Sequence, residues 1–554
     1  MRRLYYIIAL LLLVPMVARA QVEKQVEVSK DYTPTVNTAQ KLSIVPNMTD
    51  TVMMRPDVDY TVTPRTFATS LLTEKFQPAT IAYWDYQRSR PLYARAAMGV
   101  PLASEADLYA STHNKDRGYA MAYLNHWGDY RSRYNLMGDK VKRKTSEMDN
   151  RVGGRAGLYL GPRFLEVDLS ADHRLRHRYP STGETISFGR GQGKIRFGDD
   201  FADLSRWNFN IEAGGSYFMD KVLYDNFNQT NLVGSVALGK KIADRHTLRI
   251  EAAYDGTFGN KALAAYRSQI ISAGARYGFE TERLELMVGA DYYYDKVSQS
   301  TDSPHQIFPY LLLKWKNASE GFVPFVEIDG ELRRNDYASL IYANPYMVSS
   351  AAVAEALSAQ PNESLYNGRA GFGGNLGSGV FAYNLSAELS IADNHLYWYS
   401  DGADYYFTDA YQHSLRLDGN ILLRPSGAFS AEVRGGVFVW ENYNNYYSNR
   451  PNFNAGVSLR YDSRKIHAGI NLDYAGGIKW MTLDSAATLE AGKPQFSYTR
   501  TDNTLTLGVE FEWRVAERWS VYAQGRNLTG SKVYEWLHYY RSTPEGMLGV
   551  KFTL

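Results

Sequence analysis

A histidine and an aspartate lie close together where a strand-like segment runs into a long polar stretch. They are His126 and Asp129. A histidine beside a carboxylate can act as a general base near neutral pH, which is the chemistry that a hydrolase needs. Only one such pair is visible, and the motifs His-Glu-x-x-His and Gly-x-Ser-x-Gly are absent. The sequence therefore predicts no catalytic residues and no enzyme.

Metal and cofactor sites are also only weakly indicated. Asp401, Asp404 and Asp409 offer the oxygen ligands that calcium prefers, but their spacing fits no known calcium loop. Residues 189–194 resemble a phosphate-binding loop but continue with Ile195, where a hydroxyl would be needed to reach magnesium. A solvated acidic loop is the simpler interpretation of the three aspartates, and a glycine-rich turn or strand is the simpler interpretation of residues 189–194. The sequence therefore predicts no metal and no cofactor.

The polar stretch 442–450 is rich in tyrosine and asparagine. Tyr443, Asn444, Tyr446 and Tyr447 combine rigid aromatic faces with hydrogen-bonding groups and little charge. This chemistry suits a glycan or a peptide, so the four residues form a candidate extracellular ligand loop. A flexible surface loop is the alternative interpretation.

Charge and composition narrow the functional classes. The chain has 554 residues, and its 61 Lys and Arg against 59 Asp and Glu argue against nucleic acid as a partner. The chain has no cysteine, which excludes disulfides and thiol chemistry. The hydrophobic fraction of 44% excludes a disordered chain.

The N-terminus has the layout of a secretory signal peptide. Arg2 and Arg3 precede an apolar run over residues 4–17, and Ala18-Arg19-Ala20 forms a small-x-small cleavage site. We therefore expect export and cleavage after Ala20. No later apolar run reaches the ~18 residues that a membrane helix needs. Two classes of protein remain compatible with these features, a soluble exported protein and an outer-membrane β-barrel.

Apolar and polar residues alternate with period 2 along much of the chain, as strands with one apolar face require. The helical period of 3.6 is visible only weakly, near residues 345–358. In the segment 505–514, Leu507, Val509 and Phe511 are predicted to face lipid. The opposite face of such strands is strongly charged. The side chains predicted to face the lumen are Glu510, Glu512, Arg514 and Asp473.

Segment and loop lengths favour a membrane barrel over a soluble sandwich. Segments of about 10–14 residues suit tilted transmembrane strands, which need ~9–11 residues, better than ordinary strands of about 5–6. Short connections such as 462–464 alternate with long polar stretches, predicted to be loops, such as 334–365 and 394–411. The predicted fold is all-β, a transmembrane antiparallel β-barrel over residues 92–554 with about 22 strands (20 is the alternative), long extracellular loops, short periplasmic turns and both ends in the periplasm.

Two further features fit a barrel. Aromatic residues such as Trp513 and Trp519 cluster where strands meet loops, which predicts girdles at the membrane interfaces. Residues 21–91 carry repeated prolines, which deny a regular helix or ladder. We expect them to form an extended periplasmic or lumenal arm, and we expect either this arm or an inward loop, chiefly 334–365, to occlude the barrel partly.

The C-terminal region resembles TonB-dependent receptors. Short motifs similar to the closing hairpin of that family carry the resemblance: Asn527-Leu528, Tyr534-Glu535-Trp536, Pro544-Glu545-Gly546 and the final strand 549–554. The resemblance implies a barrel of twenty-two strands over residues 92–554. The chain departs from the family in that residues 21–91 are too few for a plug domain, and in ending on Leu554 rather than on an aromatic residue.

The functional hypothesis is an outer-membrane, porin-like or transport protein of TonB-dependent receptor type, which binds or passes a solute or serves as a membrane scaffold. The expected partners are outer-membrane lipid, an unidentified solute such as a glycan or a peptide, and a periplasmic or surface lipoprotein. Two alternatives stay open. One is an outer-membrane rim enzyme of protease or lipase type, and the other is a secreted soluble β-protein or adhesin.

Overall fold

A computed structural model of the chain describes most of the residues after position 90. The described residues are 91–114, 117–135, 139–141, 145–180, 184–221, 226–316, 321–377, 379–442, 444, 446–447, 449–491 and 494–554. The predicted signal peptide lies outside them, and so does the predicted arm except for its last residue.

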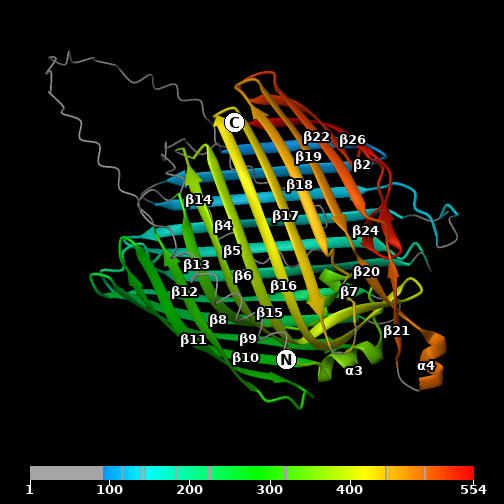
Figure 1. Ribbon diagram of the computed structural model, residues 1–554, viewed down its shortest axis with the longest axis horizontal. Helices are drawn as coiled ribbons and strands as arrows, with labels where there is room; N and C mark the ends of the chain where they lie inside the picture. Colours follow the sequence, from blue (N-terminus) through cyan, green and yellow to red (C-terminus); the bar gives the residue numbers. More distant parts are fainter. Residues whose placement is uncertain are drawn as a thin grey trace, which may run out of the picture. The chain divides into compact units, whose positions relative to one another are not determined.

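Strands dominate this part of the chain (Figure 1). The strands are β1 (Leu92–Val100), β2 (Ala103–Asn114), β3 (Gly118–Asp129), β4 (Glu147–Leu160), β5 (Arg163–His177), β6 (Thr185–Gly198), β7 (Asn208–Lys221), β8 (Asn226–Ala243), β9 (His246–Lys261), β10 (Arg267–Glu280), β11 (Leu284–Val297), β12 (His305–Trp315), β13 (Val323–Arg333), β14 (Glu363–Leu376), β15 (Phe381–Asp401), β16 (Asp404–Ser426), β17 (Phe429–Glu441), β18 (Phe453–Asp462), β19 (Ile466–Gly476), β20 (Lys479–Leu483), β21 (Phe496–Arg500), β22 (Thr504–Arg514), β23 (Trp519–Arg526), β24 (Val533–Trp536), β25 (Tyr539–Arg541) and β26 (Glu545–Thr553). The helices are α2 (Tyr337–Ala343), α3 (Ala351–Ala359) and α4 (Ser485–Ala491).

The main sheet closes on itself. It contains 24 strands, of which β20 and β21 form a hairpin at the rim, while the other 22 form the wall. The first strand, β1, pairs antiparallel with the last, β26, from Tyr93 opposite Thr553 to Val100 opposite Gly546. In Figure 1 the blue strands accordingly lie beside the red ones. The predicted all-β, closed 22-strand antiparallel barrel is confirmed.

The two ends of the barrel differ in their connections. At one end, which we call the short-turn end, strands are joined by tight links such as 161–162 and 463–465. At the other end, the long-loop end, the connections include 130–146 and 334–362. The first wall strand, β1, begins at the short-turn end, and the last wall strand, β26, ends there. At this point Leu554 N–H donates to Leu92 C=O (2.9 Å).

Apolar side chains cover the outer wall. Leu459 and Ile470 are cross-strand neighbours, and 39% and 47% of their surfaces are exposed. Four tryptophans that are more than half exposed lie beside or within the strand ends at the short-turn end: Trp207, Trp315, Trp513 and Trp519. A band of aliphatic residues bordered by amphipathic rings is the surface that a bilayer and its interface require.

One segment that was predicted to be a loop is strand. Residues 394–411 continue β15 and β16 into a long hairpin that stands above the wall and turns at Gly402, whose φ is 61°. The hairpin is aromatic-rich, and the rings of Tyr399 and Tyr406 stack across it with centroids 5.6 Å apart. Aromatic cross-strand pairs stabilise β-structure even where the neighbouring sequence is polar. The prediction of a loop, which was based on the polarity of the sequence alone, is therefore wrong for this segment.

The described helices all lie at the long-loop end. The helices α2 and α3 lie in the connection 334–362, where Asp336 caps α2 by accepting from Ser339 N–H (2.7 Å) and Ser350 caps α3 by accepting from Val353 N–H (3.3 Å). The predicted weak helical period near residues 345–358 corresponds to α3. None of the described helices is long and apolar enough to cross a membrane.

The orientation of the barrel can be tested because the chain has no cysteine of its own. We expect Asn444→Cys, at the long-loop end, to react with a membrane-impermeant maleimide on intact cells, and Arg464→Cys, in a short turn, to react only after lysis. Both positions are exposed in the structure. Labelling of Arg464→Cys but not Asn444→Cys on intact cells would reverse the orientation.

Candidate functional site

The barrel encloses a cavity of about 1600 Å³. Its lining comes from β1 to β8, from β17 to β19, from β22, β23 and β26, and from the connections at the long-loop end. This lining is rich in charged side chains, and cations and anions are mixed throughout. On the inner faces of β4, β5 and β6, Arg155, Asp168 and Lys194 lie in one row across the strands, with Arg155 Nη2 2.6 Å from Asp168. Opposite charges that face each other across strands stabilise a sheet. The cavity is thus suited to a polar solute rather than an apolar one.

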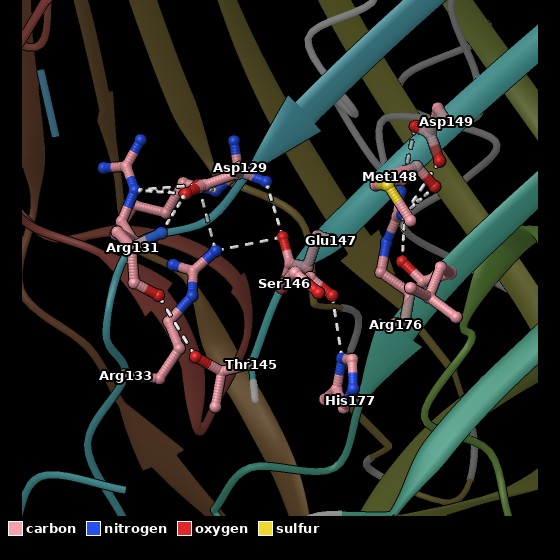
Figure 2. Close-up of polar contacts among 12 residues, drawn as sticks. Asp129, Arg131, Arg133, Thr145, Ser146, Glu147, Met148, Asp149, Arg176 and His177 are labelled. Atoms are coloured by element: carbon pink, nitrogen blue, oxygen red, sulfur yellow. Dashed lines mark hydrogen bonds and ion pairs between the residues drawn. The ribbon is translucent and has the colours of Figure 1, made fainter. Parts of the chain in front are cut away.

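The cavity is bordered at the long-loop end by a buried ion network (Figure 2). Asp129 accepts hydrogen bonds from Arg131 (2.8 Å) and Arg133 (3.1 Å), and Glu147 lies 3.0 Å from both Arg133 and Arg541. Asp129 is 0% exposed and Glu147 is 2% exposed. Charges so far from water persist only with well-placed partners. The network therefore joins the segment after β3 to the start of β4 and to the hairpin β24–β25.

The same network reaches the strands that close the barrel. Glu545, at the start of β26, lies 2.5 Å from Arg131 and 3.3 Å from Arg526. Arg526 in turn lies 2.5 Å from Glu105 on β2, and Glu105 lies 3.2 Å from Arg95 on β1. Ion pairs thus accompany the seam between the first and last strands.

The hairpin β24–β25 also carries a half-buried carboxyl, that of Glu535. Burial raises the pKa of Glu535, and the nearby Glu147 raises it further, while Arg176 and Arg541 oppose this rise. A neutral carboxyl is less costly to bury than a carboxylate. The cost of burying Glu535 as a carboxylate is therefore what raises its pKa, and Arg176 and Arg541 offset part of that cost.

Folded loop segments cover the cavity at the long-loop end, and we call them the roof. The roof comprises residues 334–362, the hairpin β24–β25 and the tip of the hairpin β15–β16. Its core is buried and mainly aromatic, and it includes Tyr337, Ile341, Tyr346, Leu357, Tyr405, Trp536 and Tyr539. The rings of Tyr346 and Tyr539 stack with their centroids 3.4 Å apart, which joins two of the three segments.

Tyrosines of α2 fix the roof to the inner wall. Tyr337 O–H donates to Asp220 on β7 (2.5 Å). Tyr342 O–H donates to Asp172 on β5, and its ring lies 4.7 Å from the guanidinium of Arg174 and 4.9 Å from that of Arg190. Hydrogen bonds to charged groups and cation–π contacts are stronger away from water. The loop predicted to turn inward thus lies against the inner wall.

Two of the residues predicted to face the lumen line the cavity. Glu510 lies 3.3 Å from His467 Nε2, and Asp473 lies 2.5 Å from Arg434. The first pair joins the neighbouring strands β19 and β22, and the second joins β17 to β19 across Gly456 of β18.

The other two lie closer to the short-turn end. Glu512 is buried, 2.5 Å from Lys551 on β26, and Arg514 lies 2.7 Å from Asp462. These pairs connect β22 to its surroundings.

The candidate ligand loop is only partly described, and Tyr443 lies outside the described residues. Asn444 is exposed. Tyr446 packs edge-on against Phe496 (5.2 Å between centroids), while Tyr447 lies 4.5 Å from Tyr498. At least part of the aromatic surface of this loop is therefore used for packing against β21.

The structure separates His126 from Asp129, so the pairing considered from the sequence is wrong. Residues three apart on a strand point to opposite faces, and Asp129 points inward to its arginines. His126 instead binds two residues of neighbouring strands, with Nε2 2.8 Å from Ser104 Oγ on β2 and Nδ1 2.7 Å from Asn150 Oδ1 on β4. Nothing local in the sequence marks this set, and only the strand register brings the three together.

Among the described residues, no group of three or more acidic or histidine side chains is arranged to hold a metal ion. Asp404, considered above for calcium, instead lies 2.9 Å from Arg178. The acidic stretch is thus tied into the roof hairpin.

No family model and no curated protein matches the chain. Solved structures do match. The FrpB iron transporter from Neisseria meningitidis (F3-3 variant) aligns with a TM-score of 0.64 and 11% identity over 84% of this chain and 81% of that one. The siderophore receptor PirA from Acinetobacter baumannii aligns with a TM-score of 0.64 and 9% identity over 84% and 80%. The copper transporter OprC aligns with a TM-score of 0.61 and 12% identity over 84% and 80%. The barrel thus has the fold of TonB-dependent receptors, as the C-terminal motifs suggested.

Proposed function

We propose that this chain is an outer-membrane protein of TonB-dependent receptor type whose barrel binds or passes a polar solute, with access from the long-loop end controlled by the roof. The observation that carries the proposal is the charged cavity of about 1600 Å³ beneath a roof that is bonded to the inner wall. A barrel that needed only to stay folded would have no requirement for a covered, charge-lined chamber.

The fold supports transport as the class of function. The similar structures are named as an iron transporter, a copper transporter and a siderophore receptor. The lining charges favour a solute with hydrogen-bonding or charged groups. The apolar outer wall and the tryptophans at the short-turn end support residence in an outer membrane. Fractionation of membranes and heat-modifiable gel migration test that location.

A membrane scaffold is the second candidate. This function is favoured by how firmly the roof closes the long-loop end of the barrel, because three separate segments of the roof share one buried core. A scaffold would use the long-loop end as a rigid surface and would never open. The two functions therefore differ in whether the roof can be removed to yield a pore.

Conductance of the purified chain in planar bilayers separates these functions. Arg333 and Glu363 are cross-strand partners, so an Asn-Gly turn can replace residues 334–362 without straining β13 and β14. We expect the intact chain to conduct weakly and this replacement to conduct as a wide pore. Deletion of residues 21–88 tests separately whether the proposed arm also occludes the lumen, and we expect it to raise the conductance.

A truncation away from the cavity provides the control. Leu483 and Phe496 are cross-strand partners, so the tip that contains α4 can likewise be replaced by Asn-Gly. This change is expected to leave the conductance as it was. A wide open pore in the intact chain would contradict occlusion, and a barrel that stays closed after both deletions would favour the scaffold.

A further inference from the structure

The outer wall of the barrel carries a serine, a histidine and an asparagine in a chain of hydrogen bonds. Ser104 Oγ lies 2.8 Å from His126 Nε2, and His126 Nδ1 lies 2.7 Å from Asn150 Oδ1. The carboxamide oxygen can only accept, so Nδ1 carries the ring proton. Nε2 is then the acceptor and faces the serine hydroxyl. This is the relation of nucleophile, base and orienting group that activates a serine in hydrolases.

The three side chains face away from the cavity. The neighbours of Ser104 on its strand, Ala103 and Glu105, are buried. His126 and Asn150 are themselves among the residues that line the cavity, but their strand neighbours Trp127 and Asp149 supply the inward side chains there, through contacts with Arg176. Because strand residues alternate between faces, Ser104, His126 and Asn150 must lie on the outside.

The position along the wall fits the depth of a lipid ester. The three residues lie within a few positions of the long-loop ends of β2, β3 and β4. On the same outer face, Leu124 and Val152 lie one step further toward the short-turn end than His126 and Asn150, and Leu108 lies two steps further than Ser104. These three side chains, Leu108, Leu124 and Val152, are 44%, 45% and 52% exposed. Exposed aliphatic side chains lie beside the acyl tails of the bilayer. The three polar residues therefore lie at the boundary between acyl tails and headgroups, and the acyl esters of membrane lipids lie at this boundary.

A tyrosine completes the arrangement. Tyr130 O–H lies 3.4 Å from Ser104 Oγ, and the backbone of Tyr130 is fixed by its N–H, which donates to Leu102 C=O (2.9 Å). When Ser104 donates its proton to His126, the tyrosine hydroxyl remains a donor beside the nucleophile. A hydroxyl in that place can stabilise the oxyanion of a tetrahedral intermediate.

We propose that Ser104, His126 and Asn150 form a lipid-facing hydrolase site that cleaves carboxylic esters of membrane lipids. Ser104 Oγ attacks the ester carbonyl carbon while His126 Nε2 takes the hydroxyl proton. The carbonyl–oxygen bond to the alcohol breaks, and His126 returns the proton to the departing alkoxide. Water then attacks the acyl-serine with His126 as the base, and the proton passes back to Ser104 as the fatty acid leaves.

The barrel itself offers a matched control. His173 Nε2 lies 3.0 Å from Ser187 Oγ on the same outer face, between β5 and β6. Among the described residues, no side chain is hydrogen-bonded to the other ring nitrogen of His173. This pair therefore has a serine and a histidine at hydrogen-bond distance but lacks an orienting third residue.

The test uses the full chain in detergent and in lipid vesicles, with a fluorophosphonate probe, p-nitrophenyl esters, diacyl phospholipid and lipopolysaccharide. We expect the probe to label Ser104, and Ser104→Ala to abolish both labelling and ester hydrolysis. His126→Gln should lower kcat by about 10²–10⁴-fold. Asn150→Ala should lower kcat with KM and heat-modifiable migration unchanged, which distinguishes a positioning residue from a structural one. Tyr130→Phe should also lower kcat.

Ser187→Ala is expected to leave labelling and hydrolysis as in the unmodified chain. Release of fatty acid from phospholipid or from lipopolysaccharide identifies the lipid source. Three results would overturn the proposal: no labelling of the unmodified chain, hydrolysis that survives Ser104→Ala, or cleavage of the soluble esters without cleavage of either lipid. The conductance experiments read out the cavity and are independent of this site.

Discussion

Glu147→Ala is expected to lower the free energy of unfolding of the barrel by about 3–5 kcal/mol, the largest effect of any single substitution considered for stability. The carboxylate of Glu147 is 2% exposed and pairs with two guanidinium groups, those of Arg133 and Arg541. Its removal would leave both cations buried with less compensation. Unfolding in urea, followed by heat-modifiable migration, measures the change.

A second acidic residue shows what an exposed ion pair contributes. Glu251 pairs with Arg249, and their side chains are 43% and 52% exposed. Glu251→Ala is expected to change the free energy of unfolding by less than about 1 kcal/mol, since exposed pairs gain little over solvation. Equal effects of Glu147→Ala and Glu251→Ala would mean that the ion network at the long-loop end is not a stabilising element.

Val509→Arg is expected to cost about 2–4 kcal/mol in a bilayer, because the side chain is predicted to face lipid near mid-membrane. Its cross-strand neighbour Ile470 is exposed on the outer wall, and Leu459 continues the same apolar row. Reversible unfolding from lipid vesicles measures the cost.

The neighbouring position provides the comparison for this substitution. Glu510→Arg places the same cation at the adjacent position of the strand. Glu510 lines the cavity and pairs with His467. The substitution is expected to cost much less, because water or acidic neighbours can solvate a lumenal cation. Similar costs for Val509→Arg and Glu510→Arg would contradict the two assigned faces.

The wall of the barrel was predictable because lipid and lumen impose a period of two on every strand. The alternation through Leu507, Val509 and Phe511 is a local signal, and it repeats until the sheet closes. The roof was only partly predictable. The helical period of α3 was visible, whereas the hairpin over residues 394–411 depends on aromatic pairing between strands and was taken for a loop.

The candidate sites depend on partners that are remote in sequence. Arg131 and Glu545 are separated by 414 positions, yet they meet in the ion network. His126 was paired in the sequence with the nearby Asp129, but the odd spacing sends the two to opposite faces of the wall. Its real neighbours come from β2 and β4, and knowledge of the register would have been needed to find them.

The seam between β1 and β26 has a consequence for how the protein is made. Eight residues of β26 are the partners of eight residues of β1, so a chain still in synthesis has two long unpaired edges and no route to remove them. Such edges invite association with other chains, and pairing of the two chain ends is slow because the whole intervening loop must be ordered first. Completion of the final strand is therefore a checkpoint for assembly. Truncation before Glu545 should yield aggregated or protease-sensitive chains rather than a smaller barrel.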